Sequence, residues 1–334
     1  MSKPLLGHST GPTFNPKPCH PLDTMQLTST DHSPAPTTAR RMENEQGREA
    51  GLRWPGGAGL AVSFVLNIEE GGEFSLTAGD ARNESVHEVV NEIVGAPDYC
   101  METHFEYGMR VGYARVVERF AKHGWPLTLN VCGRALQQSP WIAEDAQARG
   151  FEMCAHGWRW ESPALMSEVE ERTAITKTVQ TIEQIGGRAP AGWHSKSSRS
   201  VRTRELLFEH PGFFYDSDDY GGDIPYLLKR PDGQPHVVLP YAFDTNDMRF
   251  FDKASFVQGR DFGDYVIEAV NVLRQEAAQV PRMLTIGLHT RIIGRPGRIH
   301  GLDMILDELA KHPQQVWVAR REDIARHWLT HAKS

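Results

Sequence analysis

The pattern of hydrophobic and polar positions is clearest at residues 61–68, where nearly every side chain is apolar. Only Ser63 and Asn67 are polar there, and such a run is typical of a strand buried on both faces. Two carboxylates, Glu69 and Glu70, and two glycines follow at once. We therefore expect a central strand that delivers acidic side chains to the carboxyl edge of an α/β sheet. The alternative for this stretch alone is an acidic loop in solvent.

Short apolar runs alternate along the rest of the chain with longer stretches whose apolar positions recur at helical spacing. Further strands are predicted at 126–132, 151–155, 191–193, 213–215, 236–239, 283–288 and 316–319. Helices are predicted at 86–94, 111–123, 143–150, 168–185, 203–210, 262–278, 300–312 and 322–331. This alternation indicates parallel β–α–β units, and the length suits a single (β/α) barrel of about 250 residues. No glycine-rich phosphate loop follows the first strand, which disfavours a dinucleotide-binding fold.

Composition and charge narrow the class of protein. Residues 1–50 are rich in Pro, Ser, Thr, His and Gly, so we predict a disordered N-terminal tail before a folded domain at 51–334. The formal charge of −7 argues against a nucleic-acid partner, and no apolar run approaches the roughly 18 residues that span a membrane. Four scattered cysteines without a CxxC pair, and no signal-peptide pattern, predict a cytoplasmic protein without a cysteine-based zinc site.

Polar side chains directly follow several predicted strands. Besides the two glutamates, these are His156, the pair Asp216 and Asp218, and His289. In a (β/α) barrel such positions converge on one face. Each histidine alone is more often structural, but the coincidence of two histidines with acidic groups indicates a joint site. Carboxylate and imidazole, without a serine or cysteine nucleophile in a suitable setting, favour general acid–base hydrolysis.

Several segments resemble the polysaccharide deacetylases, which are also called the NodB homology or carbohydrate esterase 4 group. They are 64–71 (FVLNIEEG), 155–157 (AHG), 188–190 (RAP) and 288–289 (LH). The longer segments 106–108 (EYG), 215–218 (YDSD), 244–250 (DTNDMRF) and 288–298 (LHTRIIGRPGR) resemble the allantoinase and cyclic-amide branch of that group. The resemblance covers about 54–330. It implies a distorted (β/α) barrel of the NodB type that hydrolyses a carbon–nitrogen bond other than a peptide bond.

The resemblance also implies roles for single residues. Glu69 takes the place of the catalytic base, and Glu70 and His156 take places of metal ligands. The family's next ligand is a histidine, but this chain has Trp160 there. A hydrolytic zinc normally keeps three protein ligands, so this ligand set is incomplete. Either another residue completes a zinc site, or the enzyme needs no cofactor, as the resembling allantoinases are described; we expect the second.

Without a metal ion, a carboxylate must activate water and fixed donors must stabilise the oxyanion. We expect Glu69 or Glu70 to be the base, and the pKa of one to be raised by the other's charge. His289 would protonate the departing nitrogen. His156 or Arg188 would stabilise developing negative charge, although Arg188 is as well explained as a structural clamp on a carboxylate.

The remaining candidates would form a substrate pocket. Two tryptophans would wall it, although ordinary packing explains each equally well. Polar groups near the predicted strand ends would bind the substrate, or else pair with charged neighbours. The complete set is Glu106, Trp160, Trp193, Asp218, Asn246 and Arg291.

Three functions remain open at this stage. The first is a cytoplasmic amidohydrolase that acts on a small cyclic or ureido amide such as allantoin. The second is a metal-dependent deacetylase of N-acetylated sugars or peptidoglycan, and the third is a non-catalytic binding barrel. By analogy with the allantoinase branch, we expect a homo-oligomer whose partner is a small-molecule substrate.

Overall fold

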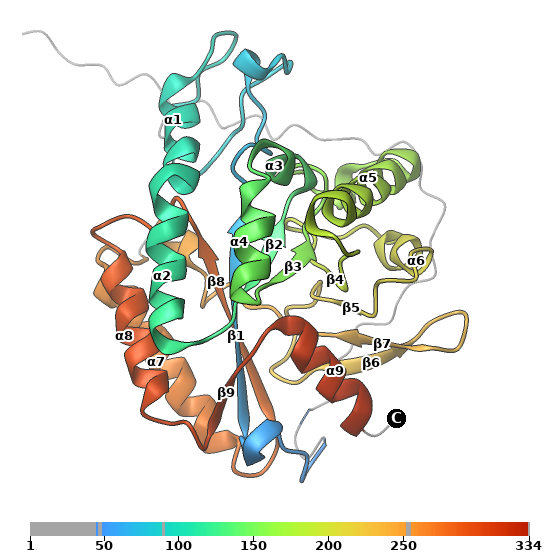
Figure 1. The fold of residues 1–334 in the computed structure, drawn as a ribbon, viewed down its shortest axis with the longest axis vertical. Helices are drawn as coiled ribbons and strands as arrows, with labels where there is room; N and C mark the ends of the chain where they lie inside the picture. Colours follow the sequence, from blue (N-terminus) through green and yellow to red (C-terminus); the bar gives the residue numbers. More distant parts are fainter. Residues whose placement is uncertain (1–44, 46–48, 89–90, 252–254, 333–334) are drawn as a thin grey trace, which may run out of the picture. The chain divides into compact units, whose positions relative to one another are not determined.

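The computed structural model describes residue 45 and residues 49–88, 91–251 and 255–332. Most of the tail predicted at 1–50 lies outside the described residues. The central strand, β1 (Leu60–Ile68), begins one residue before its predicted start, and all nine of its residues are buried. Figure 1 shows it in the middle of the sheet.

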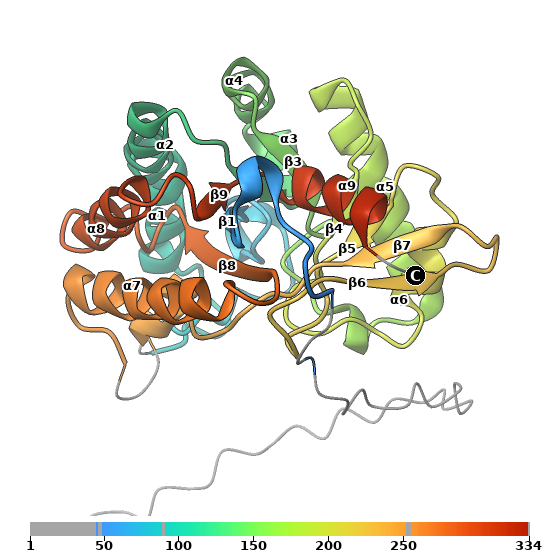
Figure 2. The ribbon, with the colours of Figure 1, turned by 90° about the horizontal axis from the view of Figure 1, so that it is seen from below.

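Within the described residues, nine strands form one curled sheet in the order β6-β7-β5-β4-β3-β2-β1-β8, with β9 also paired to β1 (Figures 1 and 2). Every pairing is parallel except the β6–β7 hairpin. The remaining strands are β2 (Thr128–Val131), β3 (Glu152–Ala155), β4 (Gly192–Trp193), β5 (Tyr215–Asp216), β6 (Tyr226–Lys229), β7 (Pro235–Val238), β8 (Arg282–His289) and β9 (Val316–Val318). The architecture agrees with the distorted (β/α) barrel of the NodB type that the sequence resemblance implies.

Strand β1 has three partners because it is much longer than two of them. It pairs with β8 along almost its whole length, from Leu60 opposite Arg282 to Asn67 opposite His289. On its other side, β9 pairs with its first residues and β2 with its last ones. The register with β8 therefore places Glu69 close to the level of His289.

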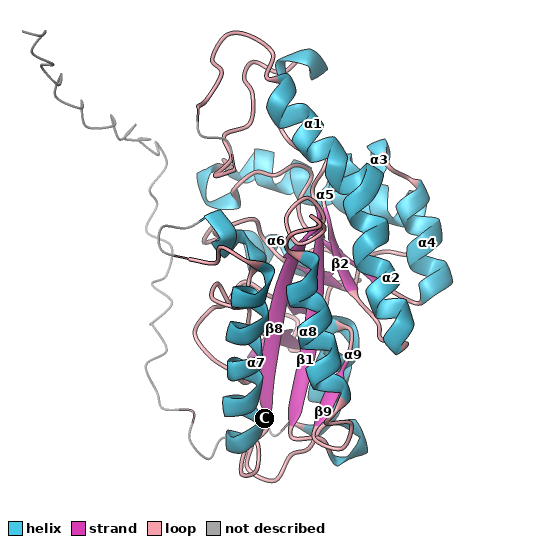
Figure 3. Ribbon diagram, turned by 90° about the vertical axis from the view of Figure 1, so that its left-hand side faces the viewer, coloured by secondary structure: helices cyan, strands magenta, loops and turns pink. Residues whose placement is uncertain are grey.

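Helices cover the outside of the sheet (Figure 3). They are α1 (Tyr99–Tyr107), α2 (Tyr113–His123), α3 (Gly133–Gln138), α4 (Trp141–Arg149), α5 (Glu168–Gly186), α6 (Thr203–Phe208), α7 (Gly259–Glu276), α8 (Ile299–Ala310) and α9 (Arg321–His331). Among the described residues, no helix combines the length and apolar composition needed to cross a bilayer.

Two helix predictions were wrong: the helix at 86–94 is not formed in its described part, and the helix at 111–123 has a different beginning. The described part of 86–94 contains no helix, and α1 begins later, where the Asp98 side chain accepts a hydrogen bond from the Met101 amide at 3.0 Å. The helix predicted at 111–123 instead continues from α1 through a π-helical turn, Gly108–Gly112. Glycine is needed at the start of this turn because a Cβ on Gly108 would collide with the Glu70 carboxylate. Such π turns are frequent at functional sites.

A short extended segment lies along the free edge of β8. Asn246 forms an isolated parallel bridge with Gly287, and the Thr245 hydroxyl donates to the Thr285 carbonyl at 2.6 Å. This segment extends the sheet beyond β8. It also carries Asp247 to the carboxyl end of β8.

Candidate active site

Three of the predicted residues, His156, His289 and Arg291, converge on the carboxylate of Glu69. This side chain lies just beyond β1 and is only 2% exposed. Its Oε1 is 3.4 Å from His156 Nε2, which follows β3, and 3.7 Å from His289 Nε2, which ends β8. Its Oε2 accepts a hydrogen bond from Arg291 Nη1 at 3.0 Å. The chain thus brings a carboxylate, two imidazoles and a guanidinium to one carboxyl edge of the sheet.

His289 is held by Asp247, which lies in the segment 244–250 that resembles the allantoinase branch. Asp247 Oδ1 lies 2.6 Å from His289 Nδ1, and Oδ2 accepts hydrogen bonds from the backbone amides of His289 at 2.8 Å and Ile293 at 3.1 Å. Burial alone would lower the pKa of His289, but the carboxylates of Asp247 and Glu69 raise it to about 10. The imidazole is therefore a cation at neutral pH and has a proton to donate.

The expectation of a carboxylate with a raised pKa was wrong for Glu69. Burial works in that direction, but His289, His156 and Arg291 together hold the pKa of Glu69 well below its usual range. Glu70 accepts hydrogen bonds from the Thr290 hydroxyl and from the Glu69 amide. The positive neighbours, rather than repulsion between the two glutamates, decide the charge of Glu69.

Arg291 is the main counter-charge of the site, and its side chain is fully buried. Besides its bond to Glu69, its Nη1 lies 3.6 Å from Glu70 Oε1, and its Nε donates to Glu88 Oε1 at 2.9 Å. Its guanidinium lies over the Phe105 ring, 4.5 Å from the centroid. Burial opposes the charged form, yet the three carboxylates raise the pKa of Arg291 further.

His156 has a fixed orientation. Its Nδ1 lies 2.6 Å from the carbonyl oxygen of His194, and since a carbonyl only accepts, Nδ1 carries the donated proton. The two imidazole rings are stacked 5.3 Å apart at 7°. The ring of His194 in turn stacks on Tyr241, with centroids 4.2 Å apart. These aromatic groups fix His156 Nε2 against Glu69.

The other predicted substrate-binding residues have mixed surroundings. Trp160 is buried, lies 5.7 Å from the Arg291 guanidinium and has Lys196 Nζ 4.1 Å above its ring. Trp193 packs in the main core and donates to the Ser195 hydroxyl at 2.9 Å. Trp160 thus borders the cluster around Glu69, whereas Trp193 supports it from the core.

Asp218 and Asn246 have local partners. Asp218 accepts hydrogen bonds from the Ser195 amide and hydroxyl, both at 2.7 Å, and its Oδ1 lies 3.3 Å from His194 Nδ1. The Asn246 side chain accepts from the Met248 amide at 2.9 Å. Both side chains order the loops that carry His194 and Asp247.

The structure does not bring Arg188 or Glu106 to the cluster. Arg188 precedes β4 and donates to Glu322 at the start of α9, with Nη2–Oε2 at 2.8 Å, so it lies at the amino edge of the sheet. Arg188 is therefore a structural clamp on a carboxylate, which was the second of its two predicted roles. Glu106 is exposed on α1 and pairs with Arg110 one turn later, at 3.4 Å. Helical geometry turns Phe105 and Gly108 inward instead, because adjacent positions on a helix face different directions.

Sequence reasoning missed Glu88, His104 and His194. Glu88 and His104 lie in a loop and a helix between the first two strands, away from any predicted strand end, and His104 Nε2 is 3.8 Å from Glu88 Oε1. His194 directly follows β4, whose end at Trp193 is also the predicted end, so the rule that selected His156 and His289 selects His194 as well.

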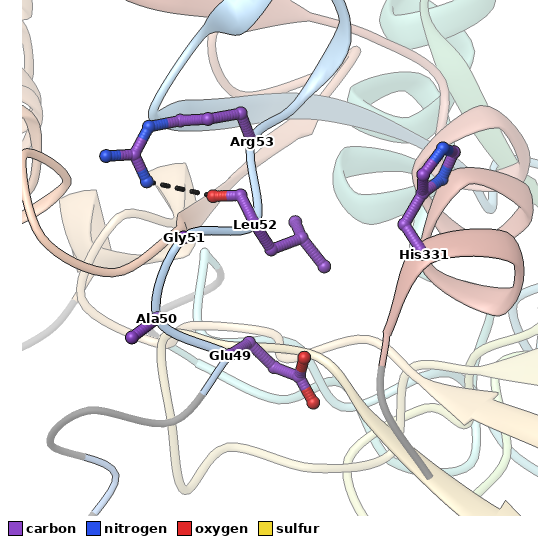
Figure 4. A pocket seen from close by; sticks show the side chains of 6 residues that line it. All are labelled: Glu49, Ala50, Gly51, Leu52, Arg53 and His331. Atoms are coloured by element: carbon purple, nitrogen blue, oxygen red, sulfur yellow. Dashed lines mark hydrogen bonds between the residues drawn. The ribbon is translucent and has the colours of Figure 1, made fainter.

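A hollow lies outside this cluster. It has a volume of about 390 Å³ and is lined by residues that include Glu49, Arg53 and His331 (Figure 4). Arg53 precedes β1 and donates to the Ala278 carbonyl before β8, which places the hollow at the amino ends of these strands. Functional groups of barrels converge on the opposite end.

The residues present do not fit a hydrolytic zinc ion. Within the described part of the chain, no group of three or more His, Cys, Asp or Glu side chains is arranged to hold a metal. His156 and Glu70 keep two family positions, but Trp160 cannot ligate a metal. The guanidinium of Arg291, which bonds Glu69 and lies 3.6 Å from Glu70, places a positive charge beside both carboxylates.

A family model described as polysaccharide deacetylase matches residues 95–204. A putative polysaccharide deacetylase of Schizosaccharomyces pombe is 34% identical over 298 residues, which is 82% of this chain and 92% of that protein. The chain belongs to the polysaccharide deacetylase family. It is accordingly a hydrolase that acts on carbon–nitrogen bonds other than peptide bonds.

Two solved structures of this family have similar folds. The crystal structure of PuuE allantoinase is 41% identical, with a TM-score of 0.79, and the match covers 84% of this chain and 94% of that one. The structure of a probable polysaccharide deacetylase from Pseudomonas aeruginosa PAO1 is 40% identical, with a TM-score of 0.78, covering 82% and 92%. These matches agree with the NodB-type barrel described above.

Proposed function

We propose that this protein hydrolyses a small cyclic or ureido amide, such as allantoin, by acid–base catalysis without a metal ion. The observation that carries the proposal is the position of Glu69, whose carboxylate contacts two imidazoles and a buried guanidinium. A carboxylate that is ionised beside an imidazole that is protonated is the pair that amide hydrolysis needs.

The proposed reaction begins with water next to Glu69. Glu69 accepts a proton from this water while the oxygen of the water attacks the amide carbon, which becomes tetrahedral. His289 then donates its Nε2 proton to the departing nitrogen, and the carbon–nitrogen bond breaks. Since Glu69 Oε1 lies 3.7 Å from His289 Nε2, the proton taken from water can return to His289 and restore both groups.

Positive charge supports the tetrahedral intermediate. The oxyanion needs fixed donors or cations that do not reorganise during the reaction. Arg291 is permanently charged, fully buried and bonded to Glu69 at 3.0 Å. His289 adds a second charge until it donates its proton. The same charges keep Glu69 ionised. Its low pKa makes it a weak base, but the ionised carboxylate is always available to accept a hydrogen bond from water.

Allantoin is favoured as the substrate by the 41% identity with PuuE allantoinase over most of both chains. The net charge of −7 is consistent with a small neutral substrate and disfavours nucleic acid. A homo-oligomer, by analogy with the allantoinase branch, and a cytoplasmic location, which the four scattered cysteines favour, complete the proposal.

Deacetylation of an N-acetylated sugar is the second candidate. It is favoured by the relatives named as putative or probable polysaccharide deacetylases, which match this chain almost as extensively. The incomplete metal-ligand set counts against it, since that activity is expected to require a metal ion.

The test is a substrate panel with the purified full-length protein. Allantoin, a dihydropyrimidine, succinimide and chitooligosaccharides are each incubated with and without EDTA, and the protein's metal content is measured. We expect turnover of a ureido or cyclic amide that EDTA does not change. Deacetylation of the sugar that EDTA abolishes would overturn the proposal in favour of the second candidate.

A further inference from the structure

Three buried polar atoms beside Glu69 have no hydrogen-bond partner among the described residues: Glu88 Oε2, His104 Nε2 and Arg291 Nη2. The side chains of Glu88 and Arg291 are 2% and 0% exposed. The three groups lie together, since Arg291 Nε bonds Glu88 Oε1 at 2.9 Å and His104 Nε2 is 3.8 Å from that oxygen. Buried polar groups are nearly always paired, so three open positions in one place point to a ligand.

The donor or acceptor character of each atom follows from its neighbours. Arg295 Nη2 lies 2.8 Å from His104 Nδ1, and an arginine can only donate. His104 Nδ1 is therefore the acceptor, which leaves the proton of the neutral imidazole on Nε2. Burial opposes ionisation of Glu88, but His104 and Arg291 lower its pKa to about 2, so Glu88 Oε2 only accepts. The open positions are two donors and one acceptor.

We propose that Glu88, His104 and Arg291 form a substrate subsite for a planar group whose carbonyl and N–H share one edge. The carbonyl oxygen would accept from Arg291 Nη2 and His104 Nε2, and the N–H would donate to Glu88 Oε2. Carbamoyl groups and the ring-locked amides of cyclic ureides and imides have this edge. The extended amide of an N-acetylated sugar does not, because its carbonyl and N–H point in opposite directions.

The subsite is coupled to the catalytic carboxylate through one side chain. Arg291 binds Glu69 through Nη1 and Glu88 through Nε. Its free Nη2 belongs to the same guanidinium and therefore lies close to both carboxylates. The rings of Phe105 and Trp160, whose centroids lie 4.5 and 5.7 Å from this guanidinium, are apolar surfaces suited to a flat ligand. This inference rests on the proposed function and narrows its substrate class.

The test measures binding of succinimide and N-methylsuccinimide by ligand-observed NMR to the full-length protein. The two probes differ only at the N–H that Glu88 would accept. We expect the wild type to bind succinimide at least about tenfold more tightly. Glu88→Gln should remove most of that preference, because its amide still accepts from Arg291 Nε but points a donor at the ligand N–H. Glu144→Gln, an exposed glutamate on α4, should keep it.

A second variant guards against misfolding of the first. His104→Phe keeps the ring but removes the donor to the carbonyl, which both probes share. It should weaken binding of both probes by a similar factor and leave their ratio unchanged. Equal binding of the two probes by the wild type, or an unchanged ratio in Glu88→Gln, would overturn the subsite even if allantoin is hydrolysed. A lost ratio in Glu88→Gln without any amide turnover would support the subsite and overturn the proposed function instead.

Discussion

Asp247 holds His289 with both of its carboxylate oxygens, one on the imidazole Nδ1 at 2.6 Å and the other on the backbone amide at 2.8 Å. Asp247 therefore fixes His289 through two contacts, one to the imidazole ring and one to the main chain. The other nitrogen of the ring, Nε2, is directed at Glu69. His289 is thus an acid, and the single buried carboxylate of Asp247 both orients its ring and stabilises its protonated form.

Replacing Asp247 by Asn should weaken this acid. Asn keeps the size of the side chain but not the charge that, against burial, raises the pKa of His289 to about 10. The cation is then less stable, so the pKa of His289 must fall. We expect kcat to drop at least about 10²-fold, and the alkaline limb of the kcat/KM profile to move to lower pH.

The control for this variant is Asp244→Asn. Asp244 is exposed and binds the Tyr265 hydroxyl at 3.1 Å, outside the cluster. Its pH profile should match that of the wild type. If Asp247→Asn lowered activity without moving the alkaline limb, His289 would not be the acid that limits the rate.

Replacing Glu69 by Gln should remove the base while keeping the shape of the site. Gln cannot take the proton of water, so kcat should fall at least about 10²-fold. Since His289 loses a nearby carboxylate, its pKa should fall as well. Substrate binding, measured on an unreactive analogue, should change much less than kcat. A variant that kept its activity but lost thermal stability would show that Glu69 is structural.

The barrel could be predicted because buried strands and amphipathic helices leave periodic patterns that do not depend on distant residues. The short helix expected at 86–94 failed because Val86 packs instead with Met101, Phe105 and Trp160 in a small cluster. The hairpin strand β6 (Tyr226–Lys229) was missed because its residues are only partly buried at the edge of the sheet. Local hydrophobicity identifies buried strands better than edge strands.

The strand-end residues of the site were equally accessible to prediction, because the ends of parallel strands meet at one edge. The electrostatics were not. The neighbouring Glu69 and Glu70 suggested repulsion, but the deciding cation, Arg291, is 222 positions from Glu69 in the chain. Glu88 and His104 approach Arg291 only because a loop and a helix fold over the strand ends. No pattern within either segment indicates that contact.

Glu73 should make the protein less stable as pH rises. Burial raises its pKa from 4.5 to about 7, and the Gly71 amide donates to its Oε2 at 2.5 Å. The folded state therefore holds the proton more tightly than the unfolded state. The resulting stabilisation is complete below pH 4.5 and is lost as pH rises through 7. It amounts to roughly 1–3 kcal/mol after allowance for partial exposure.

Glu73→Gln should remove this dependence, since a Gln can accept from Gly71 without a charge. The measurement is Tm at pH 5 and pH 8 for the variant and the wild type. The difference in Tm between the two pH values should be smaller in Glu73→Gln, and unchanged in the exposed control Glu144→Gln. An equal difference in all three proteins would show that Glu73 ionises in the folded state as it does in the unfolded one.

Replacing Arg291 by Met should destabilise the fold, because Glu69, Glu70 and Glu88 would lose their shared cation in a dry environment. Breaking a buried ion pair from one side costs about 3–5 kcal/mol, which urea unfolding can measure. Arg119→Met, which breaks a partly exposed pair with Asp303, should cost at most about 1 kcal/mol.

The double variant Arg291→Met with Glu88→Gln separates lost charge from lost packing. Removing one unpaired carboxylate should restore part of the stability that Arg291→Met lost, although each change alone is destabilising. This coupling is expected because Arg291 Nε bonds Glu88 directly at 2.9 Å. Free energies of unfolding that simply add would mean that Arg291 stabilises the fold through its contacts with Phe105 and Trp160 rather than through its charge.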